Sequence, residues 1–386
     1  MDRGSLYAIG FLTFISLGGT LAALFASGPT TPAMPQPNGW RVLEPITYEN
    51  LSVFPVVTAK GADTSGFVTL DEALASGDAV VSERGGDIMR RTRDGRPMPI
   101  QEGGASVNQL VLVNRGSKPL LLLAGELISG GKQDRVIAKD RIVAPGAEPL
   151  PLDVFCIEHG RWSSGAQFAS AKIMVHPSVR EKAAVDQKQS EVWAAVRGGT
   201  TARSAGSAVG APAAAPQISM DSIATTVATE APTQSYKGIY QSRRVGASVE
   251  NFAEELQRRF RRATEGLKGE RVVGVIVAYG GEIAWADVFA SPKLFEGYWP
   301  KLVRSYVVEA LARPQTHEQA SISDARDFLR PLQGREQVDS EPGIYRWRQV
   351  STGRYAEIEL EALKPAPLVL HTLKIHRTGD PTPLTK

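Results

Sequence analysis

The densest group of charged and polar residues follows a run of four leucines and reads GELISGGKQDR over residues 125–135. This spacing is close to that of a phosphate-binding loop, which needs a glycine, four residues, a second glycine, a lysine and then a serine or threonine. Glu126 stands where the first glycine belongs, and Gln133 stands where the magnesium-binding hydroxyl belongs, so nucleotide binding is disfavoured. Two interpretations remain: Glu126, Lys132 and Arg135 pair with one another around a glycine-rich turn, or they line a site for a small molecule or peptide.

A second polar group reads CIEHGRW over residues 156–162. Side chains alternate along a strand, so Cys156 and Glu158 share one face while His159 points the other way. A thiolate nucleophile needs a base beside it, and His159 serves as that base only if the strand breaks before it. The alternative is that Cys156 is a small buried thiol that packs as a hydrophobic residue.

Together the two groups define a candidate functional cluster, in which carboxylates can move protons and cations can hold an anionic substrate. Its members are Glu126, Lys132, Gln133, Arg135, Cys156, Glu158, Arg161 and Trp162. An enzyme would need these side chains to converge in one pocket that solvent reaches. The sequence contains no complete catalytic motif, so it leaves open whether the chain is an enzyme.

The residue types predict neither a metal site nor a cofactor. No two of the five histidines have the four-residue spacing that places both on one helix face for zinc. They are His159, His176, His317, His371 and His376. Cys156 is the only cysteine, which excludes an internal disulfide framework, a Cys-rich zinc site and an iron–sulfur cluster held by one chain.

The composition is that of a globular protein. The chain has 386 residues, with 44 Lys and Arg against 41 Asp and Glu, so its formal net charge is +3. Hydrophobic residues make up 42% and charged residues 22%, which excludes a wholly disordered chain, a collagen-like repeat and a multi-span membrane protein. With so small a net charge, we expect no nucleic-acid partner.

Residues 6–27 carry no charged side chain and are about as long as a helix must be to cross a bilayer. Arg3 precedes them, and the positive-inside rule places Arg3 on the cytoplasmic side. We therefore predict a signal anchor over residues 1–28 and a Pro-rich stalk over residues 29–41. In this interpretation the chain is a single-pass protein of the cell membrane, bound to it through residues 6–27, and its bulk is extracytoplasmic.

Two other interpretations of the amino terminus stay open. A cleavable signal peptide would give a secreted protein, but the apolar run is longer than usual and offers poor small-x-small cleavage sites, since Leu24 lies two positions before Ala26. Alternatively, residues 6–27 form a buried core helix of a cytoplasmic accessory domain.

Strand patterns dominate residues 42–197, which we expect to form a β-rich lobe with a terminal helix. Short strands recur roughly every ten residues with turn residues between them, which is typical of a β-sandwich or an open barrel. Thr69 and Glu72 have the spacing of a capping box and predict a short helix that ends near Gly77. Helical periodicity over residues 179–197 predicts the terminal helix.

Small residues fill residues 198–217, where so little apolar area cannot offset the entropy of ordering, and we predict a flexible linker or loop over residues 198–235. Residues 236–386 are expected to form an α/β lobe with C-terminal strands. The predicted fold class is thus α+β: a β-sandwich-like lobe followed by a helix/hairpin/helix α/β lobe, preceded by an N-terminal transmembrane or signal helix. The patterns leave open whether the two lobes share a sheet.

Three local patterns define the α/β lobe. Apolar residues three and four positions apart predict a helix over residues 249–263. Residues 272–279 and 282–289, joined by two glycines, predict a β-hairpin. Ser291 followed by Pro292 has the form of an N-cap and a first helical residue, and predicts that the next helix begins there.

Four sequence blocks, taken in order and spacing, resemble a known domain family. They are VTLDEALASG (68–77), GELISGGKQDRVI (125–137), CIEHGRW (156–162) and the segment 274–311 that begins GVIVAYGGEIAWADVF. The chain is similar, over about residues 42–376, to the domain family named for its association with ADP-ribosylglycohydrolase and rhodanese-phosphatase proteins. This resemblance implies no established activity, substrate or cofactor, because the family name records neighbouring proteins rather than chemistry.

The family-like positions include the candidate cluster together with Gly125 and Gly160. Family members usually carry glutamine where this chain has His159, which disfavours a mechanism that depends on that histidine. We therefore expect a membrane-anchored extracytoplasmic binding or scaffold protein, with a protein or small-molecule partner of unknown identity. One alternative is a hydrolase or transferase that acts on an anionic substrate at the Glu/Lys/Arg/Cys cluster, and another is a cytoplasmic accessory domain.

Overall fold

The computed structural model describes residues 39–83, 109–157, 167–198, 236–316 and 318–377, together with the backbone of two short strands, β6 (Met89–Arg91) and β7 (Pro97–Pro99). These residues belong to one compact unit that spans Pro35–Lys386. Within this described part, no helix is both long enough and apolar enough to cross a membrane. Several predictions fall outside it: the signal anchor, most of the stalk, the linker beyond Gly198, and the candidates Glu158, Arg161 and Trp162, as well as the possible base His159.

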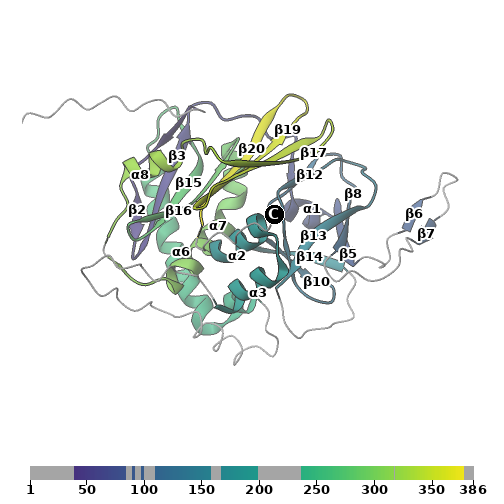
Figure 1. Cartoon of the computed structure of the whole chain (residues 1–386), viewed down its shortest axis with the longest axis horizontal. Helices are drawn as coiled ribbons and strands as arrows, with labels where there is room; N and C mark the ends of the chain where they lie inside the picture. The colour runs from purple at the N-terminus through teal and green to yellow at the C-terminus, as the bar shows by residue number, and fades with distance from the viewer. Residues whose placement is uncertain are drawn as a thin grey trace, which may run out of the picture. The chain divides into compact units, whose positions relative to one another are not determined.

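A nine-stranded antiparallel sheet is the largest element of the fold (Figure 1). In it, β3 (Leu51–Thr58) pairs with β15 (Arg271–Tyr279), so strands from opposite sides of the predicted linker share one sheet. The order across the sheet is β1 (Trp40–Val42), β3, β15, β16 (Glu282–Phe289), β20 (Leu368–His376), β19 (Tyr355–Ala362), β18 (Tyr345–Ser351) and β17 (Arg335–Glu341), and β2 (Ile46–Tyr48) also pairs with β3.

The local patterns of the predicted α/β lobe are confirmed. The hairpin of β15 and β16 turns at Gly280, whose φ of 61° lies in the left-handed region that glycine adopts without strain. Helix α7 (Pro292–Ala312) begins after the N-cap Ser291, whose hydroxyl accepts a hydrogen bond from the amide of Leu294 at 3.2 Å. Helix α6 (Arg243–Thr264) buries the predicted apolar residues Val249, Phe252, Leu256 and Phe260.

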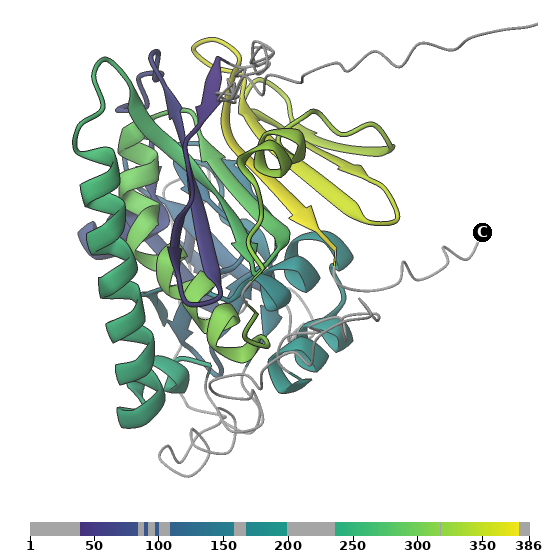
Figure 2. The same ribbon diagram turned by 90° about the vertical axis from the view of Figure 1, so that its left-hand side faces the viewer.

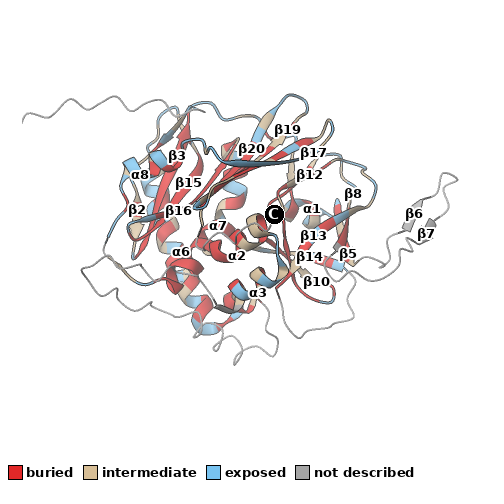
Figure 3. Cartoon of the chain, viewed as in Figure 1, coloured by how far each residue is buried: buried red, intermediate tan, exposed pale blue. Residues whose placement is uncertain are grey.

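Helices cover both faces of the sheet because its inner strands are apolar on both sides. All eight residues of β3 are buried, and such a strand needs cover on each face. Val53 and Val275 share a hydrophobic cluster with α6 and α7, which lie side by side along one face (Figure 2). Phe54 belongs to the cluster of the other face, with residues of α8 (Ile322–Phe328). Figure 3 shows these inner strands as buried over most of their length.

The predicted β-rich lobe contains a closed barrel rather than a sandwich. Its six strands, in order, are β10 (Glu126–Gly130), β11 (Arg135–Ile137), β13 (Leu150–Cys156), β8 (Gln109–Asn114), β5 (Ala79–Glu83) and β14 (Gln167–Met174). Strand β14 pairs with both β10 and β5, which closes the ring and leaves no free sheet edge. The prediction of an α+β chain built on antiparallel strands is confirmed, whereas the sandwich-like lobe is corrected to a barrel.

The capping box in this region is confirmed. Helix α1 (Leu70–Ser76) has Thr69 as its N-cap, and the Thr69 hydroxyl and the Glu72 carboxylate each bind a backbone amide of the other residue. Gly77 ends the helix in the left-handed region, at φ 79°. The helix buries Leu70 in the barrel core and holds Asp71, its second residue, at a fixed position beside β14.

One of the three hydrophobic clusters joins barrel strands to one face of the sheet. Met174 of β14 and Leu127 of β10 belong to the same buried cluster as α6 and α7. The segment after β14 continues this cluster through α2 (Pro177–Glu181), the π-helical turn at Lys182–Asp186 and α3 (Gln189–Gly198). These helices replace the single terminal helix predicted from the sequence, and they place polar residues of the barrel against polar residues of the sheet.

A further three-stranded sheet consists of β4 (Val68–Thr69), β9 (Leu120–Leu122) and β12 (Arg141–Val143), and α5 (Gly238–Gln241) precedes α6.

Candidate functional site

The structure divides the candidate cluster that the sequence suggested. Arg135 on β11 is the direct partner of Cys156 on β13, and its guanidinium lies 3.4 Å from the side-chain oxygen of Gln133. Lys132 is exposed in the turn between β10 and β11. Glu126 does not pair with Lys132 or Arg135, because its carboxylate binds a lysine of α7 instead. The remaining three candidates lie outside the described residues.

Cys156 has the surroundings of a packed thiol. It is buried, and burial raises the pKa of its thiol, although the charge of Arg135 opposes that rise. Gln189 of α3 accepts a hydrogen bond from the backbone amide of Cys156 and donates one to its carbonyl, both at 2.9 Å. A thiol with a raised pKa is protonated at neutral pH and is therefore a poor nucleophile.

Glu126, Lys301 and Asp71 form a buried ionic triad between the barrel, α7 and α1. The ammonium of Lys301 lies 2.5 Å from the Glu126 carboxylate and 2.8 Å from the Asp71 carboxylate. Glu126 also accepts a hydrogen bond of 2.7 Å from the amide of Leu123. Lys301 and Glu126 are almost fully buried, so the three charges must compensate one another.

The pKa directions within the triad follow from its two carboxylates and one ammonium. Burial raises the pKa of Glu126, and Lys301 only partly opposes this effect. Burial would also raise the pKa of Asp71, but Lys301 and a hydrogen bond from Ser170 hold it below its usual value. The pKa of Lys301 is raised despite burial, because both carboxylates favour its ammonium form. Asp71 is therefore a charged and weakly basic carboxylate.

Beside this triad lies a cavity of about 550 Å³, which we call the β14 cavity. Its polar lining comes from β10, β14, α5 with its N-cap, α6 and α7, and consists of Ser129, Ser170, Lys172, Lys237, Tyr240, Gln241, Glu250 and Arg304. The Ser170 hydroxyl donates a hydrogen bond to Asp71, which links the cavity wall to the triad.

Three cations of the β14 cavity face a single lining carboxylate. Arg304 is held by Glu250 through two contacts of 2.7 and 2.9 Å and donates to the Pro300 carbonyl at 3.1 Å, so these contacts use three of the five N–H groups of its guanidinium. Lys237 donates to the Ser129 hydroxyl at 2.7 Å and lies 3.9 Å from the buried Asp134 carboxylate, which is outside the lining. Lys172 is exposed and has a φ of 54°, a left-handed conformation that costs an L-residue roughly 1–2 kcal/mol. The lining therefore carries excess positive charge and hydroxyl groups, the chemistry that holds an anion.

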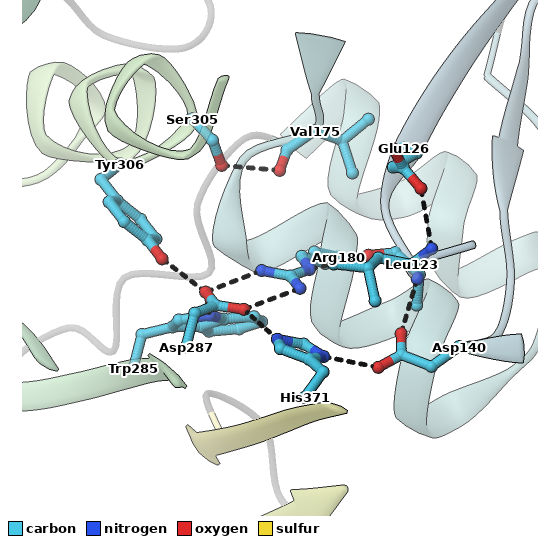
Figure 4. A network of polar contacts seen from close by, with 11 residues as sticks. Leu123, Glu126, Asp140, Val175, Arg180, Trp285, Asp287, Ser305, Tyr306 and His371 are labelled. Atoms are coloured by element: carbon cyan, nitrogen blue, oxygen red, sulfur yellow. Dashed lines mark hydrogen bonds and ion pairs between the residues drawn. The ribbon is translucent and has the colours of Figure 1, made fainter. Parts of the chain in front are cut away.

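A second ionic group, the Asp287 network, is sealed inside the fold (Figure 4). The Asp287 carboxylate binds the Arg180 guanidinium at 2.8 Å, accepts from the indole of Trp285 at 2.7 Å and accepts from the hydroxyl of Tyr306. It also lies 2.9 Å from Nε2 of His371. The network joins β16, β20, α2 and α7, so it fixes the sheet against the helices.

The Asp287 network reaches the barrel side of the fold through His371. Nδ1 of His371 lies 2.7 Å from Asp140, which also accepts from the amide of Ala124 at 2.7 Å. Since both ring nitrogens face carboxylates, His371 donates at both only as an imidazolium, and these carboxylates raise its pKa despite burial. Burial would raise the pKa of Asp287, but Arg180 and His371 hold it far below its usual value.

Sequence patterns missed most of these residues. Asp287 lies within the predicted hairpin and shares its strand face with Trp285 and Phe289, and an acid on such an apolar face is a usable signal of a buried charge. The spacing of His371 from the other histidines does not indicate that its ring lies between two carboxylates. No equivalent local signal marks Lys301, which lies 175 residues from Glu126. Among the residues whose positions are described, no group of three or more His, Cys, Asp or Glu could hold a metal ion.

The family relationship rests on nearly the whole folded part of the chain. A family model for the ARPP-1 domain, described as the ARG and Rhodanese-Phosphatase-superfamily-associated Protein domain, matches residues 39–378. Comparisons with curated proteins and with solved structures give no match. The matched range includes the barrel, the sheet, the triad and the Asp287 network. The chain therefore belongs to the ARPP-1 domain family.

Proposed function

We propose that this chain is a membrane-anchored binding protein whose folded part takes a small anionic ligand in the β14 cavity. The observation that carries the proposal is the meeting of Lys172, Lys237 and Arg304, from three separate elements, around one cavity with a single lining carboxylate. The Ser129 hydroxyl lies in the same lining and can donate its hydrogen to a ligand oxygen, because it accepts from Lys237, whereas the Ser170 hydroxyl already donates to Asp71. A volume of about 550 Å³ suits a ligand of metabolite size.

The electrostatics favour binding over hydrolysis. The pair closest to a nucleophile and its base is Ser170 with Asp71, since the hydroxyl donates to a carboxylate that Lys301 orients. However, a base must take up a proton near the working pH, and the pKa of Asp71 is held below its usual value. Asp71 therefore serves better to position the hydroxyl than to remove its proton.

A hydrolase or transferase that acts on an anionic substrate is the second candidate, because the Ser170–Asp71–Lys301 arrangement has the order of a nucleophile, a base and an orienting group. Hydrolysis of p-nitrophenyl acetate and p-nitrophenyl phosphate by the full chain tests it. Activity that Ser170→Ala abolishes, with phosphate binding retained, would replace the binding proposal.

The membrane anchor is supported by the uncharged run of residues 6–27 and by Arg3 before it. In this proposal the folded part is extracytoplasmic. We expect the full chain to stay with membranes through alkaline carbonate washing, and added protease to cut the folded part in intact cells. Release by carbonate would overturn the anchor and favour an accessory domain in the cytoplasm. A secreted product would be recognised by the loss of residues 1–28 from the mature protein.

The binding proposal is tested on the purified full chain in detergent. Inorganic phosphate, citrate and glucose 6-phosphate are titrated by calorimetry, with glucose as the uncharged control. We expect at least one anion to bind, and the double change Lys172→Gln with Lys237→Gln to weaken it by about tenfold or more, because each charge-assisted contact contributes about 1.5–3 kcal/mol. The exposed Lys364→Gln is the matched control and should leave affinity unchanged. Equal affinity in the double variant would place any anion site elsewhere.

A further inference from the structure

The end of α6 and the loop that follows it carry a concentrated positive charge. Residues 258–271 read RRFRRATEGLKGER, with six cations and two carboxylates, although the chain as a whole has a net charge of only +3. All six cations are exposed, and the five other than Arg259, which donates to Glu255 and to the Thr47 carbonyl, are called here the basic end of the domain. They are Arg258, Arg261, Arg262, Lys268 and Arg271.

Neighbouring carboxylates do not neutralise the basic end. Glu255 is shared between Arg258 and Arg259, and Glu270 binds Arg41 at 3.0 Å. The other four cations of the basic end form no ion pair with any residue that the structure describes. Cations in the last turn of α6 also interact favourably with the helix dipole, but this effect does not reach Lys268 and Arg271, which lie beyond the helix.

The described chain begins at this same end of the sheet. Thr58 of β3 is the partner of Trp40 on one side and of Arg271 on the other, so the first strand starts two strands from the basic end. In Figure 2 the loop between α6 and β15 and the start of β1 both lie at the upper end of the sheet. Twelve residues, 28–39, separate the uncharged run from Trp40, and they can span at most about 40 Å.

A partly exposed aromatic residue flanks the basic end. Trp299 of α7 is only partly buried and packs on Phe260, the buried residue between the arginines of α6, with ring centroids 4.6 Å apart. Tryptophan is enriched where proteins meet the headgroup region of a membrane, and arginine and lysine are attracted to anionic lipids there. Charge, aromatic character and the start of the chain therefore coincide on one end of the domain.

We infer that the basic end binds the anionic phospholipid headgroups of the membrane that holds residues 6–27. The inference rests on the proposed anchor and adds to it a second, electrostatic attachment that orients the domain, with the α6–β15 end toward the lipid and the β18–β19 turn away from it. A hydrophobic span combined with a basic surface is a two-signal attachment. The electrostatic part weakens when salt screens the charges.

The test places a donor fluorophore at either end of the domain and an acceptor on lipid headgroups. The full chain is reconstituted in vesicles of phosphatidylcholine, with or without 30 mol% phosphatidylglycerol, after labelling Arg262→Cys or, as the distant control, Arg354→Cys in the β18–β19 turn. Wild-type chain treated with the same label serves as the blank, because its one cysteine, Cys156, is buried and should take up little label. We expect transfer from position 262 to exceed transfer from position 354, to rise by about twofold with phosphatidylglycerol and to lose that rise in high salt.

Two triple variants distinguish attraction to anionic lipid from tethering by the anchor alone. The triple change Arg261→Gln, Arg262→Gln and Lys268→Gln, with the donor at position 271 (Arg271→Cys), should abolish the rise caused by phosphatidylglycerol. The matched triple change Arg330→Gln, Arg335→Gln and Arg354→Gln should keep it, with the same donor. Equal transfer from both ends, or a rise that survives the first triple change, would overturn the inference while leaving the anchor intact. Failure of the chain to float with vesicles of phosphatidylcholine alone would overturn the anchor, and the inference with it.

Discussion

The Asp287 network and the β14 cavity are both built from ionised side chains, but they differ in closure and in charge balance. In the network every named residue is buried, and Asp287 has four side-chain partners. In the cavity Lys172 is exposed, and three cations face one carboxylate. A sealed charge must be paired inside the protein, whereas an accessible cation can be paired by an external anion. The contrast separates residues that hold this fold together from residues that remain available for a ligand.

The largest effect is expected at the centre of the Asp287 network. Asp287→Asn keeps the shape of the side chain but removes the carboxylate charge that binds Arg180 and leaves His371 with Asp140 as its one remaining carboxylate partner. We expect the free energy of unfolding to fall by about 3–5 kcal/mol, the loss typical of breaking a buried ion pair. Urea denaturation measures it, with Asp339→Asn, an exposed surface ion pair, as the control. A loss below about 1 kcal/mol would show that the network contributes little to stability.

The triad next to the cavity should give the second largest effect. Lys301→Met removes the one cation between Glu126 and Asp71, and we expect the free energy of unfolding to fall by about 2–3 kcal/mol. The fall is smaller than for Asp287→Asn because Glu126 can take up a proton and Asp71 is partly exposed. Adding Glu126→Gln to this variant should restore at least about 1 kcal/mol, since the buried carboxylate is then neutral. Purely additive losses in this double-mutant cycle would mean that the two residues are not coupled.

The pH dependence of stability should show the charge of His371. Its pKa in the folded protein is raised above the ordinary 6.5, so its contribution is fully present below that pH and is lost as the pH rises through the folded value. Over this window the free energy of unfolding of the wild type should fall relative to His371→Gln, by up to about 1.4 kcal/mol per pH unit. Burial lowers the pKa of His176, so this residue affects the free energy of unfolding below pH 6.5. Both proteins contain His176, so its effect cancels in the comparison. Parallel curves would contradict an imidazolium at His371.

The smallest effect concerns the strained residue of the cavity. Lys172→Gly removes the strain of a left-handed backbone at an L-residue, which stabilises the folded state. Glycine also increases the conformational entropy of the unfolded chain, which opposes this gain, so the free energy of unfolding should rise by no more than about 1 kcal/mol. Loss of the cation should at the same time weaken anion binding. Gln187→Gly is the matched control, because Gln187 is also left-handed, with φ 50°, and does not line the cavity. If both variants bind anions like the wild type, Lys172 is not a ligand-binding residue.

Local sequence signals were reliable where a few neighbouring residues decide the structure. The capping box at Thr69, the N-cap at Ser291 and the hairpin at Gly280 depend on hydrogen bonds and backbone angles within about four residues. The candidate site depended on distant residues and was less predictable. The sequence marks Glu126 as a polar residue that follows a run of leucines and suggests Lys132 and Arg135 as its partners, whereas the buried cation that compensates it comes from α7.

The sequence alone determined the α+β class, the positions of the caps and the turn, and the likeness to a domain family that the whole folded part confirms. Tertiary structure decided that the strands of the first region close into a barrel, that β3 joins the sheet of the second region, and which charges meet. Asp140 and His371 lie 231 residues apart, and only the packing of the sheet on the barrel brings them into contact. Long-range pairing of this kind depends on burial of apolar surface, which offsets the cost of desolvating the paired charges and is not encoded in any short stretch of sequence.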